Sequence, residues 1–233
     1  MGPITAILFD KDGTLFDFHL SWGDWTLAVL TELACGDPQR VAALAAAIEF
    51  DLPAGRFERT SPVIAGTVGD AVARMLPLLP GMNAAELVYR LNEAAAEAPM
   101  HPAVPLLPLL TALSGRGLAL GVATNEAEAP ARRQLAAAGI APLFDFIAGC
   151  DSGHGAKPAP GQLIAFAEAT GRAPREVLMV GDSRHDLAAG RAAGMVTVGV
   201  LTGPAEAADL ADLADAVLPD IGHLPGLLDR LSA

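Results

Sequence analysis

The chain has 233 residues, of which 52% are hydrophobic and 18% charged, and its formal net charge is −12. This length and apolar content suffice for one sizeable core, or for a core domain with a smaller companion, and exclude a disordered chain. The acidic balance, with no basic run longer than Arg132-Arg133, argues against nucleic acid and acidic membrane surfaces as partners.

The sequence predicts a protein that is neither exported nor inserted in a membrane. The first apolar stretch has no basic residue before it and ends at Asp10, unlike a signal peptide. The longest apolar region, residues 103–113, contains two prolines and is too short to cross a bilayer. Cys35 and Cys150 are far apart and fit no metal-binding spacing, so we expect reduced thiols in a soluble, cytoplasmic protein.

Short apolar runs of the kind that form buried strands recur along the chain, separated by Ala- and Leu-rich segments of helical length. The predicted strands are residues 4–9, 118–123, 144–149, 177–180 and 196–201, with a weaker one at 216–218. The predicted helices between them include residues 127–138, 161–170 and 186–193, each followed by a glycine. This alternation predicts an α/β fold, a doubly wound parallel sheet with helices on both faces.

One long segment interrupts the alternation. Between the first and second predicted strands, residues 21–97 contain no convincing strand and are typical of several Ala-rich helices. Turn-forming residues separate these helices at 36–38, 52–55 and 80–81. We therefore predict a small all-helical domain at residues 18–99, inserted into a core domain made of residues 1–17 and 100–233.

The residues that directly follow the strands are the candidates for chemistry, because open parallel sheets bind ligands at the carboxyl ends of their strands. Asp10 and Asp12 follow the first predicted strand, and Asp182 and Asp186 follow the fourth. If these strands are neighbours, four carboxylates converge, and they cannot all stay ionised in a cleft without a cation. Oxygen ligands with no His or Cys cluster favour a hard divalent ion, Mg²⁺ above all.

The chain contains only two lysines, Lys11 and Lys157, against thirteen arginines. A lysine in such a background is a candidate for a task that needs a compact point charge rather than a planar guanidinium. An incidental surface position explains Lys11 equally well. Lys157 lies in a recognisable motif, which favours a functional role.

Four short motifs resemble, in order and spacing, the signature of the haloacid dehalogenase superfamily. The motifs are residues 9–17 (FDKDGTLFD), Thr124 at the end of the second predicted strand, residues 155–158 (GAKP) and residues 181–186 (GDSRHD). Each motif alone is weak, but all four lie at strand ends. The resemblance covers the whole chain, including the insertion, which looks like the helical cap of the family. It implies a Rossmann-like core and is closest to phosphoglycolate phosphatases and their relatives.

The resemblance implies a magnesium-dependent phosphatase with Asp10 as its nucleophile. A carboxylate nucleophile divides phosphate transfer into two easier steps through an aspartyl-phosphate. Asp12, two residues further along an extended chain, faces the same way. It is implied as the acid that protonates the leaving alkoxide and as the base that later activates water.

The resemblance also assigns the residues that hold the metal and the phosphate, so that fixed positive groups offset the charge of the phosphoryl oxygens. The implied Mg²⁺ ligands are Asp10, the backbone carbonyl of Asp12, and Asp182. Asp186 is implied either as a carboxylate that supports these ligands without binding the metal directly, or as the residue that orients Lys157. The implied phosphate-binding residues are Gly13, which allows a close turn, Thr124, Asn125 and Lys157; Thr124 and Lys157 also count as catalytic.

We expect the cap to select the substrate, a small phosphoester, because the insertion directly follows the first strand and can fold over the site. A substrate like phosphoglycolate ends in a carboxylate, which an arginine binds through two hydrogen bonds. Arg56 and Arg59, in a loop-like stretch, are the candidates, unless both are solvated surface charges. Residues 64–68, which follow them, resemble the substrate-facing loop of phosphoglycolate phosphatases, and His19 is a further candidate.

Other activities fit less well or stay open. Asp12 and Asp182 argue against a dehalogenase, which needs neither a second acid nor a magnesium cluster. A phosphonate-cleaving enzyme needs a lysine from the cap, and residues 18–99 contain none. A sugar-phosphate mutase, or a non-enzymatic relative that only binds phosphate, remains an alternative. The sequence leaves the physiological substrate and the oligomeric state open.

Overall fold

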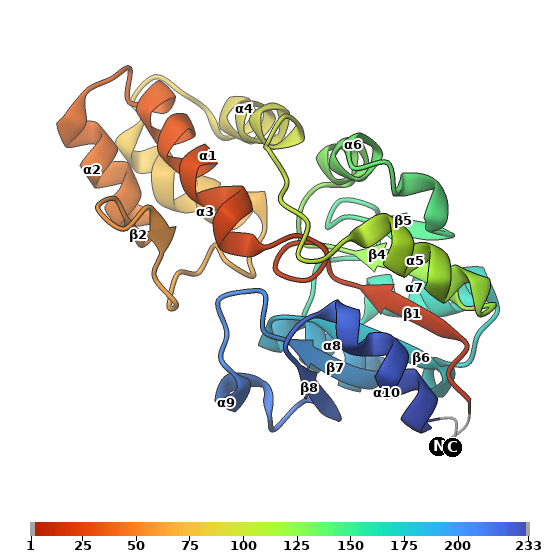
Figure 1. The fold of residues 1–233 in the computed structure, drawn as a ribbon. Coiled ribbons are helices and arrows are strands. Elements are labelled where there is room, and N and C mark those ends of the chain that lie inside the picture. Colours follow the sequence, from red (N-terminus) through yellow and green to blue (C-terminus); the bar gives the residue numbers. More distant parts are fainter. Residues whose placement is uncertain (1–2, 232–233) are drawn as a thin grey trace.

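Six strands form the central sheet of the molecule, shown in Figure 1 as a computed structural model that describes residues 3–231. The strands are β1 (Ala6–Phe9), β4 (Ala119–Ala123), β5 (Phe146–Ala148), β6 (Val177–Gly181), β7 (Val196–Val200) and β8 (Ala216–Leu218). They pair in parallel in the order β5-β4-β1-β6-β7-β8. The predicted parallel α/β core is confirmed, and β1 and β6 are the neighbours that the convergence of carboxylates requires.

Each face of the sheet carries its own apolar core. Because side chains alternate along a strand, Ile7 and Phe9 of β1 lie on one face, and Ala6 and Leu8 lie on the other. Burial on both faces explains why the strands are continuous apolar runs in the sequence. The first face packs against α5 (Leu106–Gly115), α6 (Glu128–Ala137) and α10 (Leu224–Leu231), and the second against α7 (Gly161–Thr170) and α8 (Arg184–Ala193).

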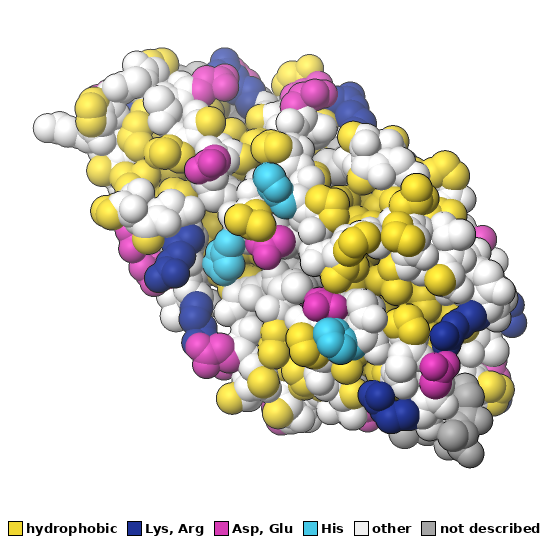
Figure 2. Space-filling view, viewed as in Figure 1, with side chains coloured by type: hydrophobic (Ala, Val, Ile, Leu, Met, Phe, Trp, Pro, Cys, Tyr) yellow, Lys and Arg dark blue, Asp and Glu magenta, His cyan; other side chains and the backbone are white. Residues whose placement is uncertain are grey.

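The apolar region at residues 103–113 forms most of α5. Leu106, Leu110 and Leu113 of this helix are buried in the core. The other side of the helix is open, since Leu107 is 54% exposed, and Figure 2 shows hydrophobic side chains gathered over this part of the surface. Among the helices of residues 3–231, none has both the length and the apolar character that crossing a membrane requires.

The insertion forms a cap with a separate apolar core, and Figure 1 shows it beside the end of the sheet toward which β1 points. Its helices are α1 (Phe18–Leu33), α2 (Pro38–Ala47), α3 (Val68–Met75) and α4 (Ala84–Ala96). Asp17, Asp37 and Asn83 begin three of these helices, because each side chain accepts hydrogen bonds from backbone N–H groups of the first turn. All four helices fall within the predicted insertion.

The prediction that the insertion is entirely helical is wrong, because it also contains a small antiparallel hairpin. Strands β2 (Phe50–Asp51) and β3 (Arg56–Phe57) pair there, and the rings of Phe50 and Phe57 pack edge to face with centroids 5.1 Å apart. Strands of two residues are too short to show the alternation by which strands are found in a sequence. The hairpin matters for the site because it brings the segment after it, residues 61–67, over the carboxyl end of the sheet.

Candidate active site

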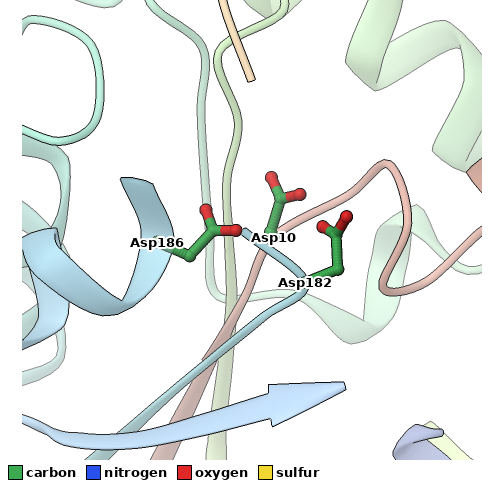
Figure 3. A group of neighbouring side chains, drawn as sticks. All are labelled: Asp10, Asp182 and Asp186. Atoms are coloured by element: carbon green, nitrogen blue, oxygen red, sulfur yellow. The ribbon is translucent and has the colours of Figure 1, made fainter. Parts of the chain in front are cut away.

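Three buried carboxylates meet at the carboxyl ends of β1 and β6. Asp10 follows β1, Asp182 follows β6, and Asp186 lies in the first turn of α8. Their oxygen atoms lie within 4.8 Å of one another, and Figure 3 shows the three side chains gathered around one point. Asp12 is the fourth carboxylate that was predicted to converge. It lines the same pocket as these three side chains, but it accepts hydrogen bonds from Lys11 and Trp22 and from none of the described residues that bond to the cluster.

A glycine lets the loop after β1 pass close to this cluster. Gly13 has a φ of +78°, and a Cβ atom at this position would collide with the carboxyl group of Asp182. Backbone hydrogen bonds close the loop, since Gly13 N–H donates to the carbonyl of Phe16 at 2.7 Å. The hydroxyl of Thr202 also donates to the Gly13 carbonyl at 2.6 Å, which connects this loop to the loop that follows β7. The predicted close turn at Gly13 is therefore present.

Burial makes ionisation of the cluster costly. It raises the pKa of Asp10 to about 7: the charge of Lys157 opposes the rise, and the charges of Asp186 and Asp12 add to it. The pKa of Asp182 is also raised well above its ordinary value. Burial is the largest cause, and the charges of Asp10 and Asp186 add to it. One lysine cannot neutralise three carboxylates, so further positive charge is needed. Buried carboxylate oxygens this close together fit a hard divalent cation, and the cluster can hold a metal ion.

Lys157 lies between two of the three carboxylates. Its Nζ donates to Oδ1 of Asp10 and to Oδ1 of Asp186, both at 2.6 Å. Burial alone would lower the pKa of Lys157, but the charges of Asp10 and Asp186 outweigh burial and raise it. Asp186 is fully engaged, because its Oδ2 accepts hydrogen bonds from the backbone N–H and the hydroxyl of Ser183. Lys157 is thus held as a permanent cation beside Asp10.

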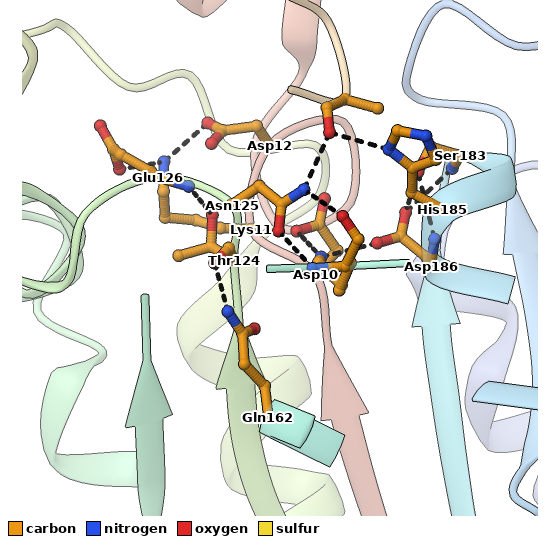
Figure 4. A network of polar contacts seen from close by, with 12 residues as sticks. Asp10, Lys11, Asp12, Thr124, Asn125, Glu126, Gln162, Ser183, His185 and Asp186 are labelled. Atoms are coloured by element: carbon orange, nitrogen blue, oxygen red, sulfur yellow. Dashed lines mark hydrogen bonds and ion pairs between the residues drawn. The ribbon is translucent and has the colours of Figure 1, made fainter. Parts of the chain in front are cut away.

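Asn125 and Thr124 join the end of β4 to this arrangement (Figure 4). The Asn125 side chain accepts a hydrogen bond from Lys157 N–H at 2.8 Å and donates to the Lys157 carbonyl at 2.9 Å. It also donates to the carbonyl of Ala65 in the cap at 2.8 Å, and Nδ1 of His185 lies 2.9 Å from the same carbonyl. Thr124 is buried and lines the pocket. Asn125 therefore positions Lys157 and docks the cap on the core.

Lys11 is fully buried, so the surface alternative for this residue is wrong. Its Nζ donates to Oδ1 of Asp12 at 2.6 Å and lies 3.2 Å from the carboxylate of Glu126. Burial raises the pKa of Glu126 to about 7, although the charge of Lys11 opposes the rise. From the cap, Nε1 of Trp22 donates to the same Oδ1 of Asp12 at 2.9 Å. A task that requires lysine at this position stays a prediction, and nothing in the sequence pointed to Glu126.

These residues enclose a cavity of about 50 Å³, which we call the acidic pocket. Ile64, Ala65 and Gly66 of the cap line it, and they belong to the segment that resembles a substrate-facing loop. The other lining residues come from the core: Asp10, Asp12, Thr124, Asn125, Glu126, Lys157, Asp182, Ser183, His185 and Asp186.

The three residues predicted to select the substrate do not line the acidic pocket. Arg59 pairs with Glu206 and Asp209 at α9 (Ala207–Leu210), and Figure 2 shows basic and acidic side chains together at this junction. Arg56 is exposed on β3, and His19 is exposed on α1. Arg59 instead lines a neighbouring hollow at the junction of cap and core, to which Asp182 and His185 also contribute.

Comparison with known proteins agrees with this geometry. A family model for haloacid dehalogenase-like hydrolases matches residues 4–194. The chain belongs to this hydrolase family. Phosphoglycolate phosphatase of Escherichia coli (strain K12) is 39% identical over 117 residues, which cover 49% of this chain and 46% of that protein. Phosphoglycolate phosphatase of Neisseria meningitidis is 40% identical over 124 residues, or 52% of each chain, so the matches span about half of these relatives.

Solved structures share the whole fold of this chain. A predicted phosphoglycolate phosphatase from Haemophilus somnus 129pt has a TM-score of 0.73 and 20% identity, covering 97% of this chain and 99% of that one. A putative β-phosphoglucomutase from Thermotoga maritima has a TM-score of 0.70 and 16% identity, with the same coverage. At these identities the likeness shows the fold alone.

We expect a divalent metal to stabilise the protein more at about pH 8 than at about pH 5. Without metal, Asp10 and Asp182 keep their protons to higher pH in the folded protein than in the unfolded chain, where carboxyl groups titrate near pH 4. The free energy of unfolding of the metal-free protein should therefore fall as pH rises from about 4 to about 7, and a bound cation should restore it.

Thermal unfolding with a chelator and with Mg²⁺, at both pH values, measures this effect. Asp182→Asn is the matched variant, because it removes one carboxylate of the cluster and should lose most of the metal-dependent shift. Equal shifts at the two pH values, or a full shift in Asp182→Asn, would contradict a metal site at this cluster.

Proposed function

We propose that this chain is a Mg²⁺-dependent phosphatase that hydrolyses a small phosphomonoester through an aspartyl-phosphate on Asp10. The observation that carries the proposal is the placement of Asp10, whose carboxylate lies between the cation of Lys157 and the carboxylate of Asp182. Membership of a hydrolase family and the similarity to enzymes named phosphoglycolate phosphatase support it. The proposed compartment is the cytoplasm, where the free thiols of Cys35 and Cys150 would stay reduced.

Asp10 acts as the nucleophile in the first proposed step. A carboxylate oxygen of Asp10 attacks phosphorus, the bond between phosphorus and the ester oxygen breaks, and the leaving alkoxide takes a proton from Asp12. In the second step, water attacks phosphorus and gives a proton to Asp12, which releases inorganic phosphate and restores Asp10. Lys157 favours the ionised, nucleophilic form of Asp10 through its hydrogen bond to Oδ1.

The proposed metal ligands are Asp10, Asp182 and the backbone carbonyl of Asp12. A bound Mg²⁺ would supply positive charge against the phosphoryl oxygens. We assign Asp186 to the support of Lys157, because Lys157 and Ser183 already occupy both of its oxygens. Lys157, Thr124 and the loop at Gly13 remain the proposed phosphate-binding groups, whereas the side chain of Asn125 is committed to the backbones of Lys157 and Ala65.

Asp12 is suited to the role of acid and base by the asymmetry of its hydrogen bonds. Lys11 and Trp22 both donate to Oδ1. Two donors on one oxygen leave the other, Oδ2, as the atom that carries the transferable proton. Because Trp22 belongs to the cap, the second of these two hydrogen bonds forms only when the cap is in place, which couples the orientation of Asp12 to closure of the site.

The same covalent chemistry serves sugar-phosphate mutases, which return the phosphoryl group to a second hydroxyl instead of to water. The likeness to a putative β-phosphoglucomutase concerns the fold and does not favour this alternative. Product analysis separates the two activities, since a phosphatase releases inorganic phosphate and a mutase produces an isomer.

We expect Asp10→Asn to fold normally and to lose turnover by about 10³-fold or more, because an amide is a poor nucleophile. Release of inorganic phosphate from alkyl phosphates in the presence of Mg²⁺ is the measurement. Asp24→Asn, which changes an exposed acid of α1, is the control and should remain active. Substantial turnover by Asp10→Asn, once deamidation has been excluded by mass spectrometry, would refute Asp10 as the nucleophile.

We expect Asp12→Asn to slow the hydrolysis of alkyl phosphates by about 10²–10⁴-fold, because the leaving alkoxide is no longer protonated. With p-nitrophenyl phosphate, whose leaving group needs no acid, the first step should survive while activation of water fails. Rapid mixing should then show a burst of about one equivalent of p-nitrophenolate per enzyme. An equal loss for both esters, without a burst, would show that Asp12 supports structure only.

We expect Arg59→Ala to change kcat/KM by the same factor for carboxylated and for neutral phosphoesters, because its guanidinium is committed to Glu206 and Asp209. The cost in stability should be below about 1 kcal/mol, as for other exposed ion pairs. Arg56→Ala serves as the control, since it removes an exposed arginine of the same hairpin. A loss confined to carboxylated substrates would restore Arg59 as a residue that selects the substrate.

A further inference from the structure

The cap encloses a second cavity, of about 170 Å³, which we call the cap cavity. Residues of α1, β3, α3 and α4 line it, together with the segment between β3 and α3. Most of the side chains on its wall are apolar or aromatic, and they include Trp22, Trp25, Val29, Phe57, Met75 and Leu91. The mechanism proposed above uses only Trp22 of these six.

The cap cavity opens onto the acidic pocket. The two share Asp12, Ile64, Gly66, Asn125 and Glu126 as lining residues. A phosphoryl group placed at Asp10 therefore has Asp12, the proposed acid for the leaving group, between itself and the cap cavity. A leaving group that takes its proton from Asp12 extends into the cap cavity.

The charges around the cap cavity disfavour a carboxylate in this position. Within the described part of the chain, no lysine, arginine or histidine lines the cavity, whereas Asp12 and Glu126 lie at its mouth. Lys11, behind these two, is fully buried and already paired with both. An anionic group would be desolvated among apolar side chains and next to like charges.

We propose that the cap cavity binds the leaving group of the substrate, and that this group is uncharged, apolar and about the size of one aromatic ring. The proposal rests on the phosphatase function proposed above. The volume supports the size, because an apolar cavity of about 150 Å³ accommodates benzene. The aromatic wall supports the chemistry, since Trp22 and Trp25 form an edge-to-face pair with ring centroids 4.8 Å apart.

One polar group on the wall refines the chemical class. Thr26 lines the cavity and is 3% exposed, and its hydroxyl has no hydrogen-bond partner among the described residues. A buried hydroxyl without a partner is costly, and a ligand atom that bonds to it removes that cost. The preferred leaving group is thus an aromatic or compact aliphatic alcohol with one hydrogen-bonding atom distant from the phosphate.

The chain carries its own probe of this cavity, because its only two tryptophans, Trp22 and Trp25, both line it. Intrinsic fluorescence of the Mg²⁺-loaded protein should therefore respond to ligands that enter the cap cavity. Benzylphosphonate and phosphonoacetate are suitable probes, since neither is a phosphoester and one carries a phenyl group where the other carries a carboxylate. We expect benzylphosphonate to change the tryptophan emission and to bind at least about tenfold more tightly than phosphonoacetate.

Kinetics with primary-alcohol phosphates give the second measurement. Relative to ethyl phosphate, kcat/KM should rise by about tenfold or more for 2-phenylethyl phosphate and should fall for 3-phosphooxypropanoate, its carboxylated counterpart. Ala71→Leu, on the cavity side of α3, should abolish most of the advantage of the phenyl group by filling the space. Ala73→Leu, on the exposed side of the same helix, is the matched control and should preserve that advantage.

The outcomes separate this inference from the proposed function. If the carboxylated ester and phosphonoacetate match or exceed their phenyl counterparts, the cap cavity does not bind an apolar leaving group, although the phosphatase function stands. If no phosphoester is hydrolysed with Mg²⁺, the proposed function fails, and the fluorescence titrations still decide whether the cavity takes an apolar group. A phenyl advantage that survives in Ala71→Leu would also overturn the proposal.

Discussion

The structure depends on three buried carboxylates that lie close together, two of them bonded to a single lysine. Asp10, Asp182 and Asp186 come from the ends of two neighbouring strands, and among residues 3–231 only Lys157 forms ion pairs with members of this cluster. The glycine at position 13 and the hydrogen bonds around Asn125 serve to keep this arrangement in place. A site with excess negative charge attracts a divalent cation, and with that cation bound it can accept a phosphate dianion that it would otherwise repel.

The cap completes the site through a few polar contacts rather than through a large charged interface. Trp22 donates to Asp12, and the carbonyl of Ala65 accepts from Asn125. Both contacts reach the residues that carry the proposed chemistry, so an open cap would leave Asp12 with Lys11 as its remaining donor and the acidic pocket exposed to water. Arg59 adds two exposed ion pairs at the edge, which orient the cap at little cost in free energy.

The sequence predicted the part of the site that depends on strand order. Apolar runs buried on both faces identify parallel strands, and polar residues directly after them must lie at one edge, as Asp10, Thr124 and Asp182 do. The sequence could not predict pairs that depend on how loops face one another. Lys11 meets Glu126 only because the loops after β1 and β4 are adjacent, and Arg59 meets Glu206 and Asp209 only because the segment after a hairpin of two-residue strands lies beside α9.

The division between core and cap has a chemical consequence. Among the described residues, the core supplies all the charged side chains that line the acidic pocket, and the cap supplies the apolar walls of the cap cavity. Binding energy from an apolar leaving group depends on contact area and does not compete with the metal or with Lys157 for the anion. A carboxylated leaving group would instead need a cation near Asp12, where Lys11 is already neutralised. The same catalytic core can therefore serve different substrates as the walls of the cap change, and in this chain those walls favour an uncharged group.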